Sequence, residues 1–254
     1  MKVAQLLKNL AARAGYHVVV SRHNPAHTLT GLPHYQFGAV IDVGANSKQF
    51  AKAMRPRSPA AEFHCFEPMP KAFELLSTWP ASEQRVTALN LALGEVQGSL
   101  EMNVHVNYDT PSSLLATTAD LAIAYPEPIA QSKLTVKVQP LNDVVERLIP
   151  PISGDILLKI DVQRYEAQVL RGASKMLGKV RTCILKVSVD ELYVGQGSFT
   201  ELVSILGAAG LQYSGNFDQI CGIDGYVISL DAVIGRRSTP LKMTATEGGA
   251  GQQL

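Results

Sequence analysis

The feature that most constrains the fold of this chain is an alternation between two hydrophobic periods. Short apolar runs have the length and composition of buried strands, and they lie at residues 39–43, 61–67, 86–93, 154–162 and 181–189. Segments with helical spacing of apolar residues separate them, at 46–54, 69–78, 141–148, 165–177 and 199–209. Strands that alternate with helices favour a mostly parallel sheet covered by helices on both faces. The sequence therefore predicts an α/β fold.

The remaining segments add strands around this alternation. Residues 98–106 alternate strongly between apolar and polar side chains, which predicts an antiparallel excursion, and the chain returns as a strand at 134–140. Two final strands are expected at 211–217 and 226–234. Residues 107–132 mix turn signals with a short apolar stretch, and a long segment of this kind inside a compact domain is often a lid or a binding loop.

Composition limits the classes of partner and the surroundings of the protein. The formal net charge is +1 and no eighteen apolar residues run together, so neither nucleic-acid binding nor a membrane span is expected. The 3 cysteines form no CxxC pair, which favours a reducing compartment and a cytoplasmic protein. The histidines are scattered, so no metal site is predicted, and the oligomeric state stays open, a homodimer being one option.

Three units are expected along the chain. An amphipathic helix and a lead-in loop occupy 1–38, one main domain occupies 39–235, and the tail 236–254 has no apolar face and is expected to be disordered. Ligands of mostly parallel sheets bind beyond the carboxyl ends of the strands, at the switch in strand order. The chemistry is therefore expected where the strands at 39–43, 61–67, 86–93 and 154–162 end.

The first of these strand ends carries Asp42, Gly44 and Asn46. Gly44 allows a tight turn close to a ligand, and the helix that follows offers free N–H groups. A dinucleotide site would have G-x-G-x-x-G directly after the strand, whereas here the acid Asp42 comes first. A carboxylate repels pyrophosphate but accepts hydrogen bonds from an ammonium group, which favours S-adenosylmethionine. The alternative is a tight turn with a polar cap.

The second and third strand ends supply further candidates for binding a cofactor. Glu67 comes twenty-five residues after Asp42 and ends the second strand, where a carboxylate can accept both hydroxyls of a ribose. Its alternative role is to cap the helix that follows Pro68. Asn90 and Ala92, in the segment NLALG, suit an adenine ring packed against the edge of the sheet, although a plain buried strand would have the same composition.

The strand at 154–162 ends in two charged residues that share one face. Strand side chains alternate, so Lys159 and Asp161 point to the same side of the sheet. Two charges at the end of a buried strand are costly unless they are paired or used. Asp161 is the candidate base, or orienting group, near the reacting methyl, and Lys159 is the candidate for stabilising an alkoxide. The alternative is an internal ion pair.

Several motifs in series resemble one family. The segments VIDVGAN, CFEPMP, NLALG, SSLL, LLKIDVQRYEAQVLRGA and VSVDELY, in this order and spacing, resemble the FkbM-type S-adenosylmethionine-dependent methyltransferases over about residues 35–235. The resemblance implies a Rossmann-like methyltransferase fold, with a mostly parallel seven-stranded sheet, helices on both faces and an antiparallel edge. It also implies O-methylation of a hydroxyl on a sugar, glycan or related natural product. Asp42, Gly44, Asn46 and Glu67 would then bind the cofactor, and Asp161 and Glu166 would lie near the substrate.

Three residues depart from the pattern of that family. Lys48 and Arg164 stand where glycine is expected, and Lys186 stands where glutamate is expected. One hypothesis is a working O-methyltransferase whose added bases favour an anionic acceptor, such as a uronic acid or a phosphorylated sugar. The other is a degenerate member that binds the cofactor weakly and serves as a partner or regulator. A nucleotide-sugar dehydrogenase or epimerase is disfavoured by the missing glycines of the dinucleotide motif.

Overall fold

The computed structural model describes residues 35–105, 131–148, 151–189, 195–222 and 224–237, together with residues 7, 10, 11 and 13. The predicted opening helix, most of the predicted long loop at 107–132 and the tail lie largely outside these residues. No helix in the described ranges is both long enough and apolar enough to cross a membrane.

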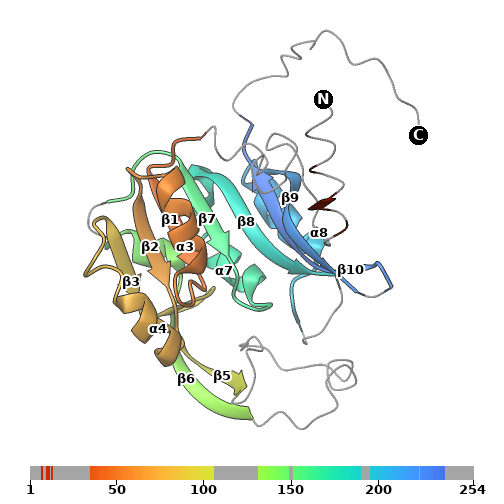
Figure 1. The fold of residues 1–254 in the computed structure, drawn as a ribbon. Helices are drawn as coiled ribbons and strands as arrows, with labels where there is room; N and C mark the ends of the chain where they lie inside the picture. Colours follow the sequence, from red (N-terminus) through yellow and green to blue (C-terminus); the bar gives the residue numbers. More distant parts are fainter. Residues whose placement is uncertain are drawn as a thin grey trace.

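The core of the molecule is a seven-stranded sheet in the order β3-β2-β1-β7-β8-β10-β9 (Figure 1). Strand β10 pairs antiparallel with both of its neighbours, and the other pairs are parallel. The bounds are β1 Ala39–Val43, β2 Glu62–Phe66, β3 Val86–Leu89, β7 Ile156–Ile160, β8 Val180–Ser188, β9 Gln212–Cys221 and β10 Val227–Gly235. The predicted mostly parallel sheet with an antiparallel element is confirmed.

Helices cover both faces of this sheet (Figure 1). One face packs against α3 (Gln49–Met54) and α4 (Pro70–Ser77), and the short 3-10 helix η3 (Arg55–Arg57) follows α3. The other face packs against α6 (Leu141–Val145), α7 (Glu166–Gly172) and α8 (Phe199–Ala208), and the 3-10 helix η4 (Leu177–Lys179) leads into β8. Alternation along β1 supplies both cores, since Val40 faces α3 while Ile41 and Val43 face α7.

A second sheet of three strands, in the order β4-β6-β5, extends from the first. Its strands are β4 (Ala92–Leu93), β5 (Gly98–His105) and β6 (Gln131–Gln139), and the antiparallel pairing of β5 with β6 confirms the predicted excursion. The prediction of one continuous strand over 86–93 was wrong. The backbone turns between β3 and β4, where the Leu91 N–H bonds the Leu89 carbonyl, and β4 joins the second sheet.

Candidate functional site

The candidate site follows from the alternation of side chains along the strands, on the face of the sheet that packs against α3. On four neighbouring strands, an apolar residue of the core beneath α3 has a charged residue two positions nearer the carboxyl ends of the parallel strands. These pairs are Val40 and Asp42 on β1, Leu157 and Lys159 on β7, Ile184 and Lys186 on β8, and Val233 and Asp231 on β10. Because the parallel strands end at one edge, their charged residues gather above the core.

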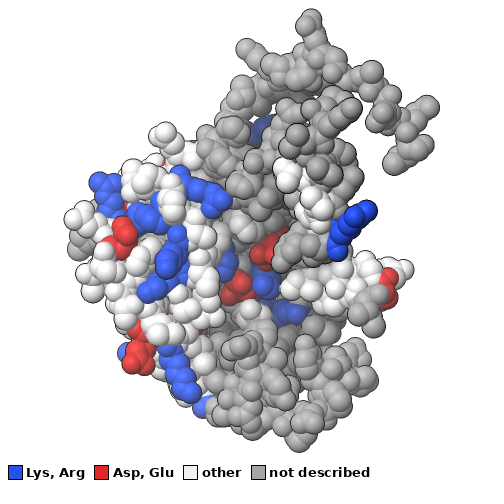
Figure 2. Space-filling view, in the orientation of Figure 1, with Lys and Arg blue, Asp and Glu red and all other residues white. Residues whose placement is uncertain are grey.

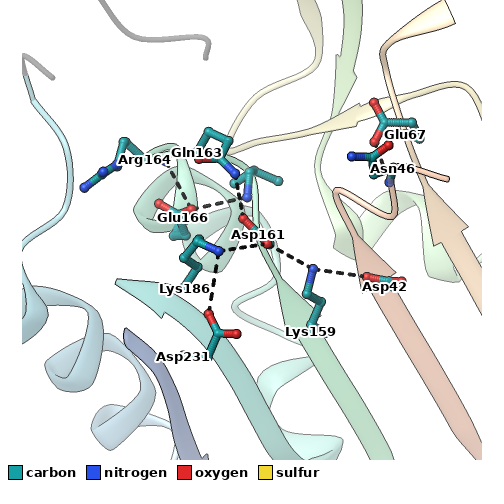
Figure 3. Close-up of polar contacts among 11 residues, drawn as sticks. Asp42, Asn46, Glu67, Lys159, Asp161, Gln163, Arg164, Glu166, Lys186 and Asp231 are labelled. Carbon is teal, nitrogen blue, oxygen red and sulfur yellow. Dashed lines mark hydrogen bonds and ion pairs between the residues drawn. The ribbon is translucent and has the colours of Figure 1, made fainter. Parts of the chain in front are cut away.

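Five side chains of alternating charge form a row, the charged row, along this edge of the sheet: Asp42, Lys159, Asp161, Lys186 and Asp231 (Figure 3). Lys159 Nζ lies 3.7 Å from Asp42 Oδ1 and 3.4 Å from Asp161 Oδ2. Lys186 Nζ lies 3.5 Å from the same Asp161 oxygen and 3.9 Å from Asp231 Oδ1. Asp161 is therefore held between two ammonium groups. The predicted common face of Lys159 and Asp161 is confirmed, and the two residues form the ion pair that was the alternative to a catalytic role.

Burial acts on the pKa values of Asp42 and Lys159, the most buried members of the charged row. Burial raises the pKa of Asp42, which is 0% exposed, and neighbouring Lys159 acts in the opposite direction. For Lys159, burial acts to lower the pKa, but the carboxylates of Asp42 and Asp161 outweigh it and the pKa is raised. The ammonium also lies 5.6 Å from the centre of the Phe50 ring on α3. Lys159 is thus held in its charged form.

Gly44 brings the loop after β1 against the loop after β7. Its φ of +76° lies in the left-handed region, and a Cβ at this position would lie 2.0 Å from the backbone oxygen of Asp161. The Asp161 N–H in turn donates to the carbonyl of Val43 at 2.9 Å. Only glycine permits this approach, so Gly44 sets how close Asp161 comes to the first loop.

Glu67 follows β2 and is fixed by backbone donors from two loops. The Asn46 N–H donates to Oε2 and the Met69 N–H donates to Oε1, each at 2.8 Å. Burial raises the pKa of Glu67, and these two hydrogen bonds act to lower it. Each carboxylate oxygen can accept a second hydrogen bond, so the group keeps capacity for a ligand.

A cavity of about 860 Å³ lies over this edge of the sheet, within the range of small-molecule sites. Figure 2 shows acidic and basic side chains close together near the middle of this face. The lining comes from the β1–α3 loop and the start of α3, the β2–α4 loop and the start of α4, β5, β7 and its following loop, and β10. It comprises Gly44, Ala45, Asn46, Ser47, Gln49, Phe50, Glu67, Pro68, Met69, Lys71, Ala72, Met102, Lys159, Asp161, Gln163 and Asp231.

Five of the nine predicted site residues line this cavity: Gly44, Asn46, Glu67, Lys159 and Asp161. Asp42 does not; its carboxylate has no hydrogen-bond partner among the described residues and faces Lys159, which does line the cavity. The predicted direct contact between Asp42 and the cofactor stays a prediction.

The predicted adenine residues lie beside the main cavity rather than in its lining. Asn90 donates to the carbonyls of Glu67 and Pro68, at 2.8 and 3.1 Å, and lines a neighbouring hollow of about 360 Å³. Ala92 is buried on β4, in the small core of the second sheet. A direct role in cofactor binding stays a prediction for both residues.

Glu166 begins α7 and supports the loop that follows β7. Its Oε1 accepts the N–H groups of Val162 and Arg164, at 3.2 and 3.1 Å, and its side chain is not part of the cavity lining. Burial raises its pKa to about 7. In this arrangement Glu166 holds the loop that carries Gln163, whose amide donates to Asp161 Oδ1 at 2.9 Å.

The three departures from the family pattern have distinct structural settings. Lys48 has a φ of +74° and Arg164 a φ of +84°, so both occupy the left-handed backbone that favours glycine. Lys48 nevertheless points away from the cavity: its ammonium donates to Thr78 Oγ1 at 3.0 Å and to the Leu75 carbonyl at 3.3 Å, at the end of α4. The Arg164 side chain points away from the charged row (Figure 3). Lys186 lies between two carboxylates.

Asp231 and Gln163 are site residues that the sequence pattern did not predict. The available signal for Asp231 is that it is the one charged residue in the segment YVISLDAVI, and Gln163 lies in the motif around Asp161. Both line the cavity.

Comparison with known proteins places the chain in a family. The profile of the methyltransferase FkbM domain matches residues 42–213, from the charged row into β9. The chain belongs to the FkbM methyltransferase family. The enzyme class predicted from the sequence, an S-adenosylmethionine-dependent methyltransferase, is confirmed.

Two curated relatives share the family-level likeness. Methyltransferase sdnD of Sordaria araneosa is 25% identical over 191 residues, which covers 66% of this chain and 71% of that protein. The 2-O-methyltransferase NoeI of Sinorhizobium fredii is 22% identical over 173 residues, covering 66% and 70% of the two chains. Among solved structures, the N-methyltransferase NodS of Bradyrhizobium japonicum aligns with a TM-score of 0.45 at 11% identity, over 85% of this chain and 98% of that one. That likeness is too slight to support an inference.

The residues of this FkbM family member fit the cofactor. Gly44 lets the first loop pack against the backbone of Asp161, and the loop residues Gly44, Ala45 and Asn46 line the cavity. Glu67 presents a fixed carboxylate whose oxygens keep free acceptor capacity. The cavity joins both groups and is large enough for a molecule the size of S-adenosylmethionine.

Proposed function

We infer that this protein is an O-methyltransferase that acts on a hydroxyl of a sugar, a glycan or a related natural product. The observation that carries the inference is Asp161, a carboxylate that lines the cavity and is fixed by Lys159, Lys186 and Gln163. A hydroxyl must lose its proton when it is methylated, and a positioned carboxylate can accept that proton. The relative NoeI, whose name specifies a 2-O-methyltransferase, supports this reaction type.

The cofactor half of the cavity would be formed by the loops after β1 and β2. Glu67 would accept the hydroxyls of the ribose, while its hydrogen bonds to Asn46 and Met69 keep the carboxylate in place. Asp42 would act through Lys159, because its buried carboxylate lies 3.7 Å from that ammonium. When bound, S-adenosylmethionine supplies a methyl group that is already activated for in-line transfer.

Alignment is the main contribution required of the protein. Holding the acceptor hydroxyl in line accounts for about 7–11 kcal/mol of barrier reduction in well-oriented reactions. Proton removal by Asp161 adds about 10²–10⁴-fold. Lys159 would orient the carboxylate and stabilise the developing alkoxide, and Glu166 would act as a positioning residue by holding the loop of Gln163.

The hypothesis of a degenerate member depended chiefly on Lys48. Because its ammonium contacts the end of α4, the Lys48 side chain lies outside the cavity lining and would not obstruct a cofactor there. Asp161, Glu67 and Gly44 line the same cavity, which supports a working enzyme. The enzyme is therefore the better-supported function.

The substitution Asp161→Asn tests the proposal. It preserves size and hydrogen bonding but removes the base, so kcat is expected to fall at least about 100-fold while the Kd for S-adenosylmethionine changes little. Turnover is measured as transfer of labelled methyl to a panel of glycosides, and the Kd is measured by calorimetry. Unchanged turnover together with weakened cofactor binding would instead assign Asp161 to the cofactor.

A further inference from the structure

The cavity continues past Asp161 to Asp231, a residue that the cofactor and the methyl-transfer step leave unused. Asp231 lies on β10 and lines the cavity at the end opposite Glu67 (Figure 3). The loops of β1 and β2 form the cofactor end, so the β8–β10 end is where the acceptor must enter. Asp231 is therefore positioned to contact the part of the acceptor next to the reacting hydroxyl.

Strand register fixes Asp231 relative to the proposed base. Asp231 is the direct cross-strand neighbour of Lys186, and the Lys186 ammonium lies within 4 Å of a carboxylate oxygen on each of Asp231 and Asp161, at 3.9 and 3.5 Å. One ammonium thus bridges two carboxylates and sets their spacing. Among the described residues the Asp231 carboxylate has this ion pair but no side-chain hydrogen bond, so its oxygens keep their capacity to accept.

The charges at this end of the cavity sum to a negative value. The charged row carries three carboxylates, on Asp42, Asp161 and Asp231, against the two ammonium groups of Lys159 and Lys186. Lys71, the other cation of the cavity lining, lies on α4 at the Glu67 end. Lys48 lies outside the cavity lining. A carboxylate or phosphate on the acceptor would meet like charge here, whereas neutral hydroxyls would donate hydrogen bonds.

We propose that Asp231, bridged to Asp161 by Lys186, is the acceptor-specificity residue and selects neutral polyhydroxylated acceptors over uronic acids and sugar phosphates. It accepts hydrogen bonds from hydroxyls adjacent to the one that is methylated. This inference rests on the proposed O-methyltransferase function and replaces the anionic acceptor that the added bases suggested. Burial, partly offset by Lys186, raises the pKa of Asp231, which is consistent with a carboxylate that gains from new hydrogen-bond donors.

The test compares matched acceptors. Purified protein is incubated at pH 8 with methyl-labelled S-adenosylmethionine and either a panel of neutral methyl glycosides or the corresponding methyl uronosides. The wild type is expected to label neutral glycosides at least about tenfold faster than their uronoside counterparts. The Asp231→Asn variant is expected to lose about 10–100-fold in kcat/KM on the neutral acceptor, the usual effect of losing hydrogen bonds to a charged group, and to reject uronosides less.

The matched control is Asp143→Asn. Asp143 is exposed on α6, on the opposite face of the sheet and outside the cavity lining, so the variant removes the same charge without removing an acceptor contact. Its acceptor preference should equal that of the wild type, and thermal melting checks that both variants fold.

Three results would overturn the proposal. These are faster labelling of uronosides by the wild type, an unchanged acceptor ratio in Asp231→Asn, and cofactor binding by calorimetry with no labelled neutral glycoside. Failure to bind S-adenosylmethionine at all would overturn the proposed function itself.

Discussion

Replacing Lys48 by alanine and by glycine tests whether the left-handed backbone at this position costs the protein stability. Lys48 precedes α3 with a φ of +74°, and its ammonium bonds Thr78 and the Leu75 carbonyl at the end of α4. Both variants lose these two hydrogen bonds equally. Their difference therefore isolates the backbone at residue 48.

The magnitude follows from two opposing contributions. A left-handed conformation costs an L-residue roughly 1–2 kcal/mol, and glycine avoids this cost. Glycine in turn loses about 0.5–1 kcal/mol more chain entropy on folding than alanine. We therefore expect Lys48→Gly to be more stable than Lys48→Ala by about 1 kcal/mol. Relative to the wild type, Lys48→Ala should lose about 1 kcal/mol, because exposed hydrogen bonds contribute little each.

Urea unfolding of the three proteins, followed by circular dichroism, measures the free energies of unfolding. Calorimetry with S-adenosylmethionine on the same samples should give Kd values within about threefold of one another, because the side chain points away from the cavity. An alanine variant at least as stable as the glycine variant would refute the strain. A large change in Kd in either variant would refute the orientation of the lysine.

Two further predictions concern pH. Burial lowers the pKa of His64 to about 4, so the folded state excludes a proton that the unfolded chain binds at 6.5. The wild type should therefore lose about 3 kcal/mol of stability relative to a His64→Leu variant as the pH drops from 6.5 to 4, while Glu166 acts in the opposite direction in both proteins. Urea unfolding of the wild type and of His64→Leu at pH 6.5 and pH 4 measures this contribution. A stability difference between the two proteins that does not change with pH would contradict it. Burial raises the pKa of Glu166 to about 7, so stability is lost as the pH rises from 4.5 through 7. Glu166→Gln should therefore gain about 3 kcal/mol on the wild type between pH 4.5 and pH 8, and a constant difference would refute this.

The fold was largely predictable because the two hydrophobic periods are clear. Strands β1, β2, β7 and β8 coincide with short apolar runs that are typical of buried strands, and the helices between them favour parallel pairing. The split between β3 and β4 was not predictable from VTALNLAL, since the residues of both strands are mostly apolar. What divides them is a tertiary preference, the pairing of Ala92 and Leu93 with β6.

The candidate site was predictable where a charge interrupts an apolar strand end. Asp161, Lys159 and Glu67 were found in this way and line the cavity. The direction in which a long side chain points was harder to predict than its place in the chain. A sequence shows that Lys48 stands in the cofactor loop, but the direction of its four-carbon side chain depends on the end of α4, twenty-seven residues further along the chain.

The measurement that tests the account most directly is a calorimetric titration of S-adenosylmethionine into the wild type and into Glu67→Gln. The wild type is expected to bind the cofactor. The variant is expected to bind at least about tenfold more weakly, because a neutral amide replaces the charged group proposed to accept the ribose hydroxyls. No heat from the wild type at millimolar cofactor, or equal affinities for the two proteins, would contradict the account.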